Sequence, residues 1–142
     1  SFPTRRSSDL GGNTFKSMIR DLSLDYPDFL IASSEWFAFV PAKEYFDEPG
    51  DHADELETSV MMHYHPELVN LDEAGNGDYK KFTSQMLNEK VAWIPRNWQK
   101  VSQDTGIGNP KKASAGKGKK YAEAVVAKYA LLFEELVHKE LY

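Results

Sequence analysis

The residues of this sequence that could do chemistry together are gathered in one short segment, residues 51–59, which reads Asp-His-Ala-Asp-Glu-Leu-Glu-Thr-Ser. His52 and Glu55 are three residues apart, so a helical turn would point both side chains in the same direction. Imidazole nitrogen and carboxylate oxygen are both ligands of divalent cations in proteins. Histidine also has an ordinary pKa of about 6.5, which suits it to proton transfer near neutral pH. The segment is therefore a candidate for metal binding or for general acid–base catalysis.

The same segment has a structural interpretation that needs no ligand. Asp and Glu are common in the first turn of ordinary helices, because the amino-terminal end of a helix carries a partial positive charge. Asp51 would cap such a helix by accepting a hydrogen bond from a backbone N–H group. Since two ligands do not make a metal site, spacing alone leaves both interpretations open.

Apolar spacing predicts the helix that carries this segment. Leu56, Val60 and Tyr64 recur four residues apart and predict a helix over residues 53–63. Pro66 ends it, because the residue before a proline avoids helical geometry. The segment should therefore lie where a loop becomes a helix.

Other stretches of the chain show weaker and stronger helical patterns. Apolar residues within 15–22 predict an earlier helix that ends before Pro27. The strongest pattern is the last one, because apolar residues of 122–137 share one face of a closing helix. Residues 80–89 form at best a marginal helix, and residues 105–118 read as a long connection rich in glycine and lysine.

Two short apolar runs, residues 28–32 and 91–94, read as strands. A glycine-rich turn, a helix and an apolar strand in that order are typical of a parallel α/β sheet. No internal repeat is present and the pattern requires no domain boundary.

Composition limits the classes of protein to which the chain can belong. Its 142 residues are 41% hydrophobic, which suffices for a globular core, and it has no cysteine to form a disulfide or a thiolate ligand. The net charge of −5 disfavours nucleic acid or an anionic membrane as a partner. No apolar run approaches the roughly 18–20 residues of a membrane-spanning helix. A cytoplasmic protein is expected.

The first ten residues are expected not to belong to the native protein. Residues 1–10 lack the apolar core and cleavage site of a signal peptide. They resemble the translation of a DNA-sequencing adapter that has been read through into the gene. Residues 1–10 are therefore interpreted as a non-native scar.

Four motifs in register resemble the creatininase family of metal-dependent amidohydrolases. Residues 52–59 resemble the family signature His-Ala-Gly-Glu-x-Glu-Thr-Ser, and residues 11–13 resemble the end of its Asn-Gly-His-Gly-Gly-Asn loop. Residues 66–69 match the Pro-(Glu/Asp)-Leu-Val that follows the signature, and residues 106–110 resemble a Gly-x-x-Gly-Asp-Pro stretch before the closing helix. The resemblance identifies residues 11–142 as the C-terminal half of such a domain.

The resemblance implies a three-layer α/β/α fold with a mostly parallel sheet, of which this chain is an incomplete C-terminal fragment. It also implies two divalent metal ions per site, Zn, Mn or Fe, that share a water. A cation lowers the pKa of bound water from about 15.7 toward 7, so the resulting hydroxide can attack an amide carbon. Family members are typically homo-oligomers, and the implied partner is a small-molecule amide substrate.

The resemblance assigns a role to each matching residue. Glu55 matches a metal ligand of the family, and His52 matches the histidine that is suited to proton transfer to the leaving nitrogen. Glu57 is expected to orient the ligands, or to stabilise the helix turn, rather than to bind the metal itself. The implied active-site loop consists of Gly11, Gly12 and Asn13.

The chain departs from the family pattern at several positions. Leu10 stands where the family loop has a metal-binding histidine, and Asp54 stands where the signature has glycine. The upstream Glu-x-His pair and the bridging aspartate of the family have no counterpart in the chain. Creatinine-cleaving members have a Trp-Asp pair shortly before the signature, whereas this chain has Glu48-Pro49, which disfavours creatinine as the substrate.

Two functions follow from these observations. The expected one is hydrolysis of a C–N bond in a small cyclic amide, ureide or formamide, with the 142-residue chain inactive by itself. The alternative is a non-catalytic binding or assembly module that keeps the signature without the reaction.

Overall fold

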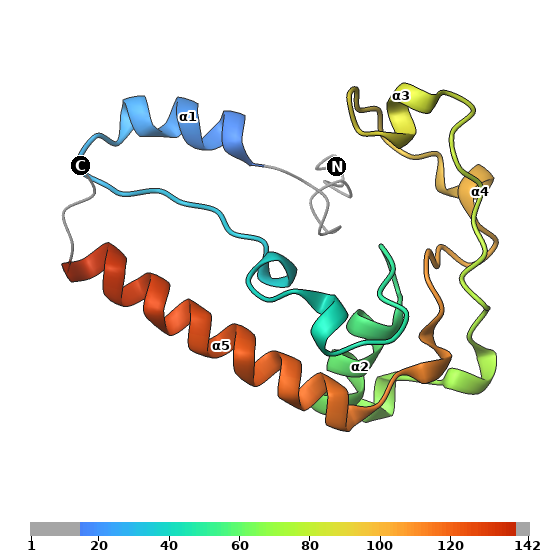
Figure 1. Ribbon diagram of the computed structural model, residues 1–142. Coiled ribbons are helices and arrows are strands. Elements are labelled where there is room, and N and C mark those ends of the chain that lie inside the picture. The colour runs from blue at the N-terminus through green and yellow to red at the C-terminus, as the bar shows by residue number, and fades with distance from the viewer. Residues whose placement is uncertain (1–14, 139–142) are drawn as a thin grey trace, which may run out of the picture. The chain divides into compact units, whose positions relative to one another are not determined.

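The computed structural model describes residues 15–138, in which the chain divides into two compact units that meet in the sequence between Phe39 and Val40. Both units consist of helices and irregular connections (Figure 1). The second unit contains residues 51–59, and the two units are described separately below.

The first unit begins with helix α1, Lys16–Asp25, which confirms the helix predicted at this position. The helix ends there because Pro27 disfavours helical geometry at Tyr26, whose φ is −129° and ψ 65°. A short 3-10 helix, η2 (Trp36–Ala38), follows near the end of the unit.

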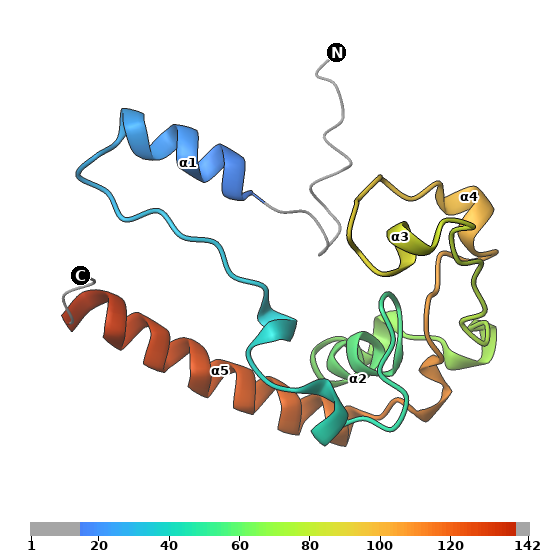
Figure 2. The same ribbon diagram turned by 45° about the horizontal axis from the view of Figure 1, so that its top comes forward.

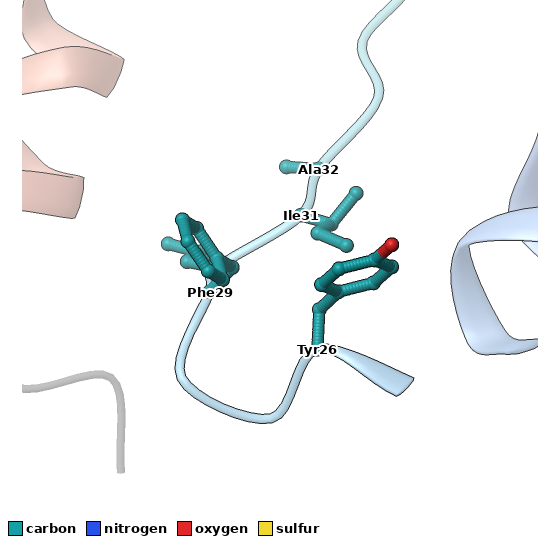
Figure 3. Close-up of a pocket in the computed structure, with 5 residues that line it drawn as sticks. Tyr26, Phe29, Ile31 and Ala32 are labelled. Carbon is teal, nitrogen blue, oxygen red and sulfur yellow. The ribbon is translucent and has the colours of Figure 1, made fainter. Parts of the chain in front are cut away.

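Between these helices the predicted strand over residues 28–32 is absent. The backbone turns instead, with the Phe29 N–H donating to the Tyr26 carbonyl oxygen at 3.1 Å and the two rings meeting edge to face at 6.3 Å. Figure 3 shows these side chains beside Ile31 and Ala32. Together with Leu30 they line a hollow of about 480 Å³. Phe29 is 70% exposed, so this apolar run is not buried as a strand inside a sheet would be.

The second unit is built around two helices, α2 (Glu55–Tyr64) and α5 (Ala115–His138). Both were predicted; α5 begins several residues earlier than expected, within the stretch interpreted as a connection. The marginal helix expected over residues 80–89 is reduced to a single short turn. The shorter elements are η3 (Ala42–Glu44), η4 (Pro66–Leu68), η5 (Leu71–Glu73), α3 (Gln85–Asn88), α4 (Trp98–Val101) and η6 (Pro110–Lys112).

Helix α2 packs against the first turns of α5, as both ribbon views show (Figures 1 and 2). The backbones approach closely at Gly118, where an added Cβ would lie 1.9 Å from the carbonyl oxygen of Ser59. Only a residue without a side chain fits at this distance. The Ser59 hydroxyl also accepts a hydrogen bond from the Ser114 N–H at 3.1 Å, which fixes the start of α5 beside α2.

The core of this unit surrounds Tyr121 of α5, which is fully buried. Its ring meets Tyr45 and Phe46 edge to face at centroid distances of 5.3 and 5.2 Å, and its hydroxyl donates to the Val40 carbonyl oxygen at 3.2 Å. Leu56 of α2 is also buried. The loop that precedes α2 is therefore held against the first half of α5.

The expectation of a three-layer α/β/α fold with a parallel sheet is wrong for this structure. Within residues 15–138 there is no strand, and the β-type pairing consists of an isolated antiparallel bridge between His52 and Ile107. A strand is stable only when a neighbour satisfies its backbone hydrogen-bonding groups. The predicted strand over residues 91–94 has no such neighbour, and Trp93 within it is 77% exposed.

Beyond its packed first turns, α5 carries apolar side chains that are exposed. Leu131 is 53%, Phe133 61% and Val137 74% exposed. The apolar face predicted for this helix is thus buried only near its start. None of the helices within residues 15–138 is both long enough and apolar enough to cross a membrane.

Candidate functional site

Asp54 is the residue that caps helix α2. Its Oδ1 accepts a hydrogen bond from the Glu57 N–H at 2.9 Å, and its Oδ2 accepts one from the Gly50 N–H at 2.5 Å. The residue is only 4% exposed. Asp51, the residue proposed as the cap from sequence, does not have this role. Asp54 therefore uses both of its carboxylate oxygens to join the preceding loop to the helix.

Glu57 completes the junction between loop and helix. Its Oε2 accepts a hydrogen bond at 2.7 Å from the N–H of Ala53, the residue before the cap Asp54. Ala53 has a φ of +48°, a left-handed conformation that an alanine adopts only at a cost in free energy. The hydrogen bond to Glu57 helps to hold this bend, which turns the chain at His52 into the helix.

His52 lies between a carboxylate and an indole ring. Its Nδ1 is 3.5 Å from Oε2 of Glu57, and its ring lies 5.1 Å from the ring of Trp98. Its backbone pairs with Ile107 through two hydrogen bonds, of 3.1 and 2.8 Å. These contacts hold His52 on several sides. Its side chain is 29% exposed and so still reaches solvent.

An ion pair between Asp51 and Arg96 holds Trp98 near His52. The guanidinium donates to both carboxylate oxygens of Asp51, at 2.6 and 2.7 Å, and lies 5.5 Å from the centre of the Trp98 ring. Hydrogen bonding from Arg96 lowers the pKa of Asp51, and the same contact raises the pKa of Arg96. A bidentate pair of this kind has a defined geometry. It therefore fixes the segment of Trp98 against the loop that carries His52.

Glu55 is fully buried, and both of its carboxylate oxygens have partners. Oε2 accepts a hydrogen bond from the Glu48 N–H at 2.7 Å. Oε1 is paired with the Nζ of Lys117, which comes from the first turn of α5. The negative charge of Glu55 is thus compensated by a cation from the protein itself.

Lys117 has other acceptors besides Glu55. Its Nζ is 2.8 Å from Oδ2 of Asp47 and 3.2 Å from the carbonyl oxygen of Lys112. Hydrogen bonds to Asp47 and to Glu55 raise the pKa of Lys117. An ammonium group has three protons to donate, and three acceptors surround this one. Lys117 is therefore charged and fully hydrogen bonded beside Glu55.

The described residues do not by themselves fit the metal ions that the family implies. A ligand oxygen must be open to the cation, and both oxygens of Glu55 are engaged. Within residues 15–138, no three histidine, aspartate or glutamate side chains gather as a metal site would require. His52 contacts Glu57 and Trp98, whereas Glu55 has a separate set of partners. Gly11, Gly12 and Asn13 lie outside the described residues.

A hollow of about 430 Å³ lies along the same end of α2. Its lining includes Glu57 and Met61 of the helix, with Asp104 and Gly106 from the connection that leads to Ile107. Glu57 therefore takes part both in the contact with His52 and in the wall of this hollow.

Sequence reasoning missed three residues that shape the site: Arg96, Trp98 and Lys117. These residues lie far along the chain from the segment they contact, so no local spacing could have indicated them. For Arg96 and Lys117 the signal is chemical, because an acidic segment needs basic partners from elsewhere in the chain. Trp98 has no such signal.

Comparison with known proteins agrees with the motifs in residues 52–59 and beyond. The sequence model of the creatininase family, described as creatinine amidohydrolase, matches residues 10–133. A crystal structure of a Bacteroides fragilis NCTC 9343 protein named "Putative creatinine amidohydrolase" is 60% identical, with a TM-score of 0.86. The match covers 93% of this chain and 53% of that one, so the chain spans about half the length of its structural relative. No curated protein matches the sequence.

The matched region contains every contact described above, from the pairing of Asp51 to that of Lys117. It makes up most of the chain, and the structural relative is similar in both sequence and fold. The chain therefore belongs to the creatininase family.

Proposed function

We propose that the protein hydrolyses a C–N bond in a small cyclic amide, ureide or formamide. Family membership and the 60% identity with a protein named as a creatinine amidohydrolase support this reaction class. The observation that carries the proposal is the placement of His52, whose ring is held between Glu57 and Trp98 with part of its surface open to solvent.

His52 is the residue we assign to proton transfer. Hydrolysis of an amide requires a proton on the leaving nitrogen, and histidine can supply it near neutral pH. Glu57 faces Nδ1 at 3.5 Å, which leaves Nε2 for the substrate. Trp98 restricts the orientation of the ring. A ring held in one orientation delivers its proton to the leaving nitrogen as the C–N bond breaks.

The substrate is proposed to differ from creatinine. Glu48 occupies the region where creatinine-cleaving members have their Trp-Asp pair, and it is already engaged in holding the site together. Its backbone N–H donates to Glu55, and its carboxylate pairs with Lys112 at 2.7 Å and with the Asn109 amide at 3.0 Å. A residue with these partners is not free to bind a substrate ring.

Metal dependence is part of the proposal because the creatininase family is generally metal-dependent. Zinc, manganese and iron are the candidate metals, since each accepts imidazole and carboxylate ligands. Glu55 is the ligand we propose from this chain, a role that requires Lys117 to release its Oε1. The remaining ligands would come from outside residues 15–138, because no metal-binding group forms within them.

The proposal can be tested in a chimaera that joins this chain to the part of the Bacteroides fragilis protein that the match does not cover. The chimaera is assayed for hydrolysis of a cyclic amide, a cyclic ureide, a formamide and creatinine. His52→Gln is expected to lower the rate on the preferred substrate by about 10²–10⁴-fold, the usual contribution of a general acid. His65→Gln is the matched control, because His65 is exposed and pairs with Glu67.

Equal loss of activity in both variants would contradict the assignment of His52. A metal-bound, folded chimaera without activity on all four substrates would contradict the reaction class. That second result would favour the alternative function, a non-catalytic binding or assembly module. The ion pair with Lys117, which neutralises the carboxylate of Glu55, also favours this alternative.

A further inference from the structure

Four side chains at the site make a closed series of contacts. The guanidinium of Arg96 donates to both carboxylate oxygens of Asp51, at 2.6 and 2.7 Å. Its central carbon also lies 5.5 Å from the centre of the Trp98 ring. The Trp98 ring in turn lies 5.1 Å from the ring of His52, the residue that follows Asp51 in the chain. Arg96 therefore joins the start of this series to its end.

The Asp51 side of the series is fixed by the backbone. The N–H groups of Asp51 and His52 both donate to the carbonyl oxygen of Ile107, at 2.8 and 3.1 Å. The Ile107 N–H donates back to the His52 carbonyl oxygen at 2.8 Å, and the Ile107 side chain is buried. The carboxylate of Asp51 therefore offers Arg96 a fixed anchor.

The Arg96 side of the series is less firmly held. Residues 91–94 just before it are exposed, and α4 is a single helical turn that begins at Trp98. One turn is not stable by itself in water, because starting a helix costs more free energy than its first hydrogen bonds return. The end of α4 is tied elsewhere by a hydrogen bond of 2.7 Å from the Lys80 N–H to the Val101 carbonyl oxygen. At the beginning of the turn, the position of the Trp98 ring depends on Arg96.

A guanidinium group is suited to holding both contacts at once. It is planar, so its forked N–H groups match a carboxylate while its face lies against an aromatic ring. An ammonium group pairs with a carboxylate as a point charge and does not fix a plane. A lysine in place of Arg96 would therefore keep the ion pair with Asp51 and lose the link to Trp98.

We propose that Arg96 is a positioning residue, which holds Trp98 against the imidazole of His52 and thereby sets the orientation in which this ring transfers its proton. The inference deepens the proposed function and rests on it in assigning proton transfer to His52. The placement of the imidazole by Arg96 is independent of that assignment. The experiment therefore has one part that observes the placement and one that measures hydrolysis.

The first part compares the 142-residue chain with its conservative variant Arg96→Lys by NMR. The nuclear Overhauser effect between the ring protons of His52 and Trp98 reports on their contact, and His52→Gln identifies the histidine signal. Arg96→Lys is expected to abolish this effect. The midpoint of thermal unfolding should change by no more than about 5 °C, because the partly exposed ion pair is retained. Arg20→Lys is the matched control and should change neither, since Arg20 is exposed on α1.

The second part uses the chimaera and its preferred substrate. Arg96→Lys is expected to lower kcat by about 10- to 100-fold and to leave KM within about twofold, because a small misplacement affects the reaction more than binding. In the His52→Gln background the same substitution should have no further effect on kcat, since Arg96 acts through His52. A merely structural role of Arg96 would lower kcat in both backgrounds.

Three results would overturn the inference. They are an Overhauser effect of unchanged strength in Arg96→Lys, an equal loss of kcat in the two backgrounds, and a raised KM with kcat unchanged. Should Arg96→Lys fail to fold, as judged by circular dichroism, Asp51→Asn breaks the same pair from its other side and is measured in its place. Loss of the Overhauser effect, together with a chimaera that hydrolyses none of the substrates, would support the placement by Arg96 and contradict only the proposed function.

Discussion

At the scale of single residues, the site consists of pairs that each join residues 51–57 to a distant part of the chain. Arg96 pairs with Asp51, Trp98 with His52, and Lys117 with Glu55. Each pair combines a residue of the segment 51–59 with a residue outside it. The motif therefore supplies the reactive groups, and residues far along the chain set their orientation.

Asp51 should make the stability of the protein depend on pH in acid. Arg96 lowers the pKa of Asp51 below its ordinary value of 3.8, so the folded protein keeps this carboxylate charged at a pH where the unfolded chain begins to protonate it. The stabilisation is complete above the ordinary value and is lost as pH falls through the lowered one. Asp51→Asn should therefore cost less at pH 3 than at pH 7.

The free energy of unfolding in urea at the two pH values measures this effect. A difference below about 1 kcal/mol is expected, because the pair is partly exposed. Arg96→Gln should likewise lower the free energy of unfolding less at pH 3 than at pH 7. The double variant Asp51→Asn/Arg96→Gln should lower it little more than either single variant does. A cost of Asp51→Asn that is equal at both pH values would show that the ion pair does not stabilise the fold.

The sequence alone did not reveal which aspartate caps helix α2. Asp51 and Asp54 both precede the predicted helix, and either can accept a hydrogen bond from a free N–H group. The choice depends on where the helix begins, and Ala53 bends the chain with a positive φ just before Asp54. Helix boundaries are less certain from sequence than helices themselves, so the cap was assigned to Asp51 and not to Asp54.

At the scale of elements, the contact between α2 and α5 is the feature on which the site depends. It brings Lys117 to Glu55 and fixes both helix starts near Ser59. The close approach at Gly118 permits this contact, whereas Gly116, two residues earlier in α5, has open space around it. The two glycines make a matched pair for a test.

Gly118→Ala is expected to destabilise the protein by about 1–3 kcal/mol, because the new methyl group would overlap the Ser59 backbone. Gly116→Ala is expected to stabilise it by roughly 0.5–1 kcal/mol, since alanine is the better helix former and nothing lies within 4 Å. Thermal unfolding followed by circular dichroism compares the two. Equal effects of the two substitutions would contradict the close contact between α2 and α5.

The three long helices were predicted correctly from sequence and the two strands were predicted wrongly, for a physical reason. A helix satisfies its own backbone, so the spacing of apolar residues in α1, α2 and α5 was sufficient. A strand needs a partner, which apolar composition alone does not provide. Residues 28–32 and 91–94 have the composition of strands, but within the described part of the chain nothing pairs with them.

At the scale of the whole molecule, the candidate site is incomplete within residues 15–138. The chain spans about half the length of its structural relative, and no metal-binding group forms in the described residues. The resemblance identified residues 11–142 with the creatininase family, and the match of the family model to residues 10–133 confirms the family. The contacts of Glu55 required the structure.

The 142-residue chain alone is therefore expected to show no hydrolysis of the four test substrates, with or without added Zn²⁺, Mn²⁺ or Fe²⁺. The chimaera with the uncovered part of the Bacteroides fragilis protein is expected to be active. Product formation measured for both proteins at equal concentration decides the matter. Activity of the 142-residue chain that disappears in its His52→Gln variant would show that residues outside it are not needed.

The bridge between His52 and Ile107 has a consequence for the order of folding. A hydrogen-bonded pair so far apart in sequence closes a long loop. The chain loses conformational entropy when this loop closes, before the pair can stabilise the fold. Helix α2 can form from its own residues, whereas the orientation of the histidine must wait for the return of the chain. We expect the imidazole to acquire its final surroundings late, after the helices that frame it have already assembled.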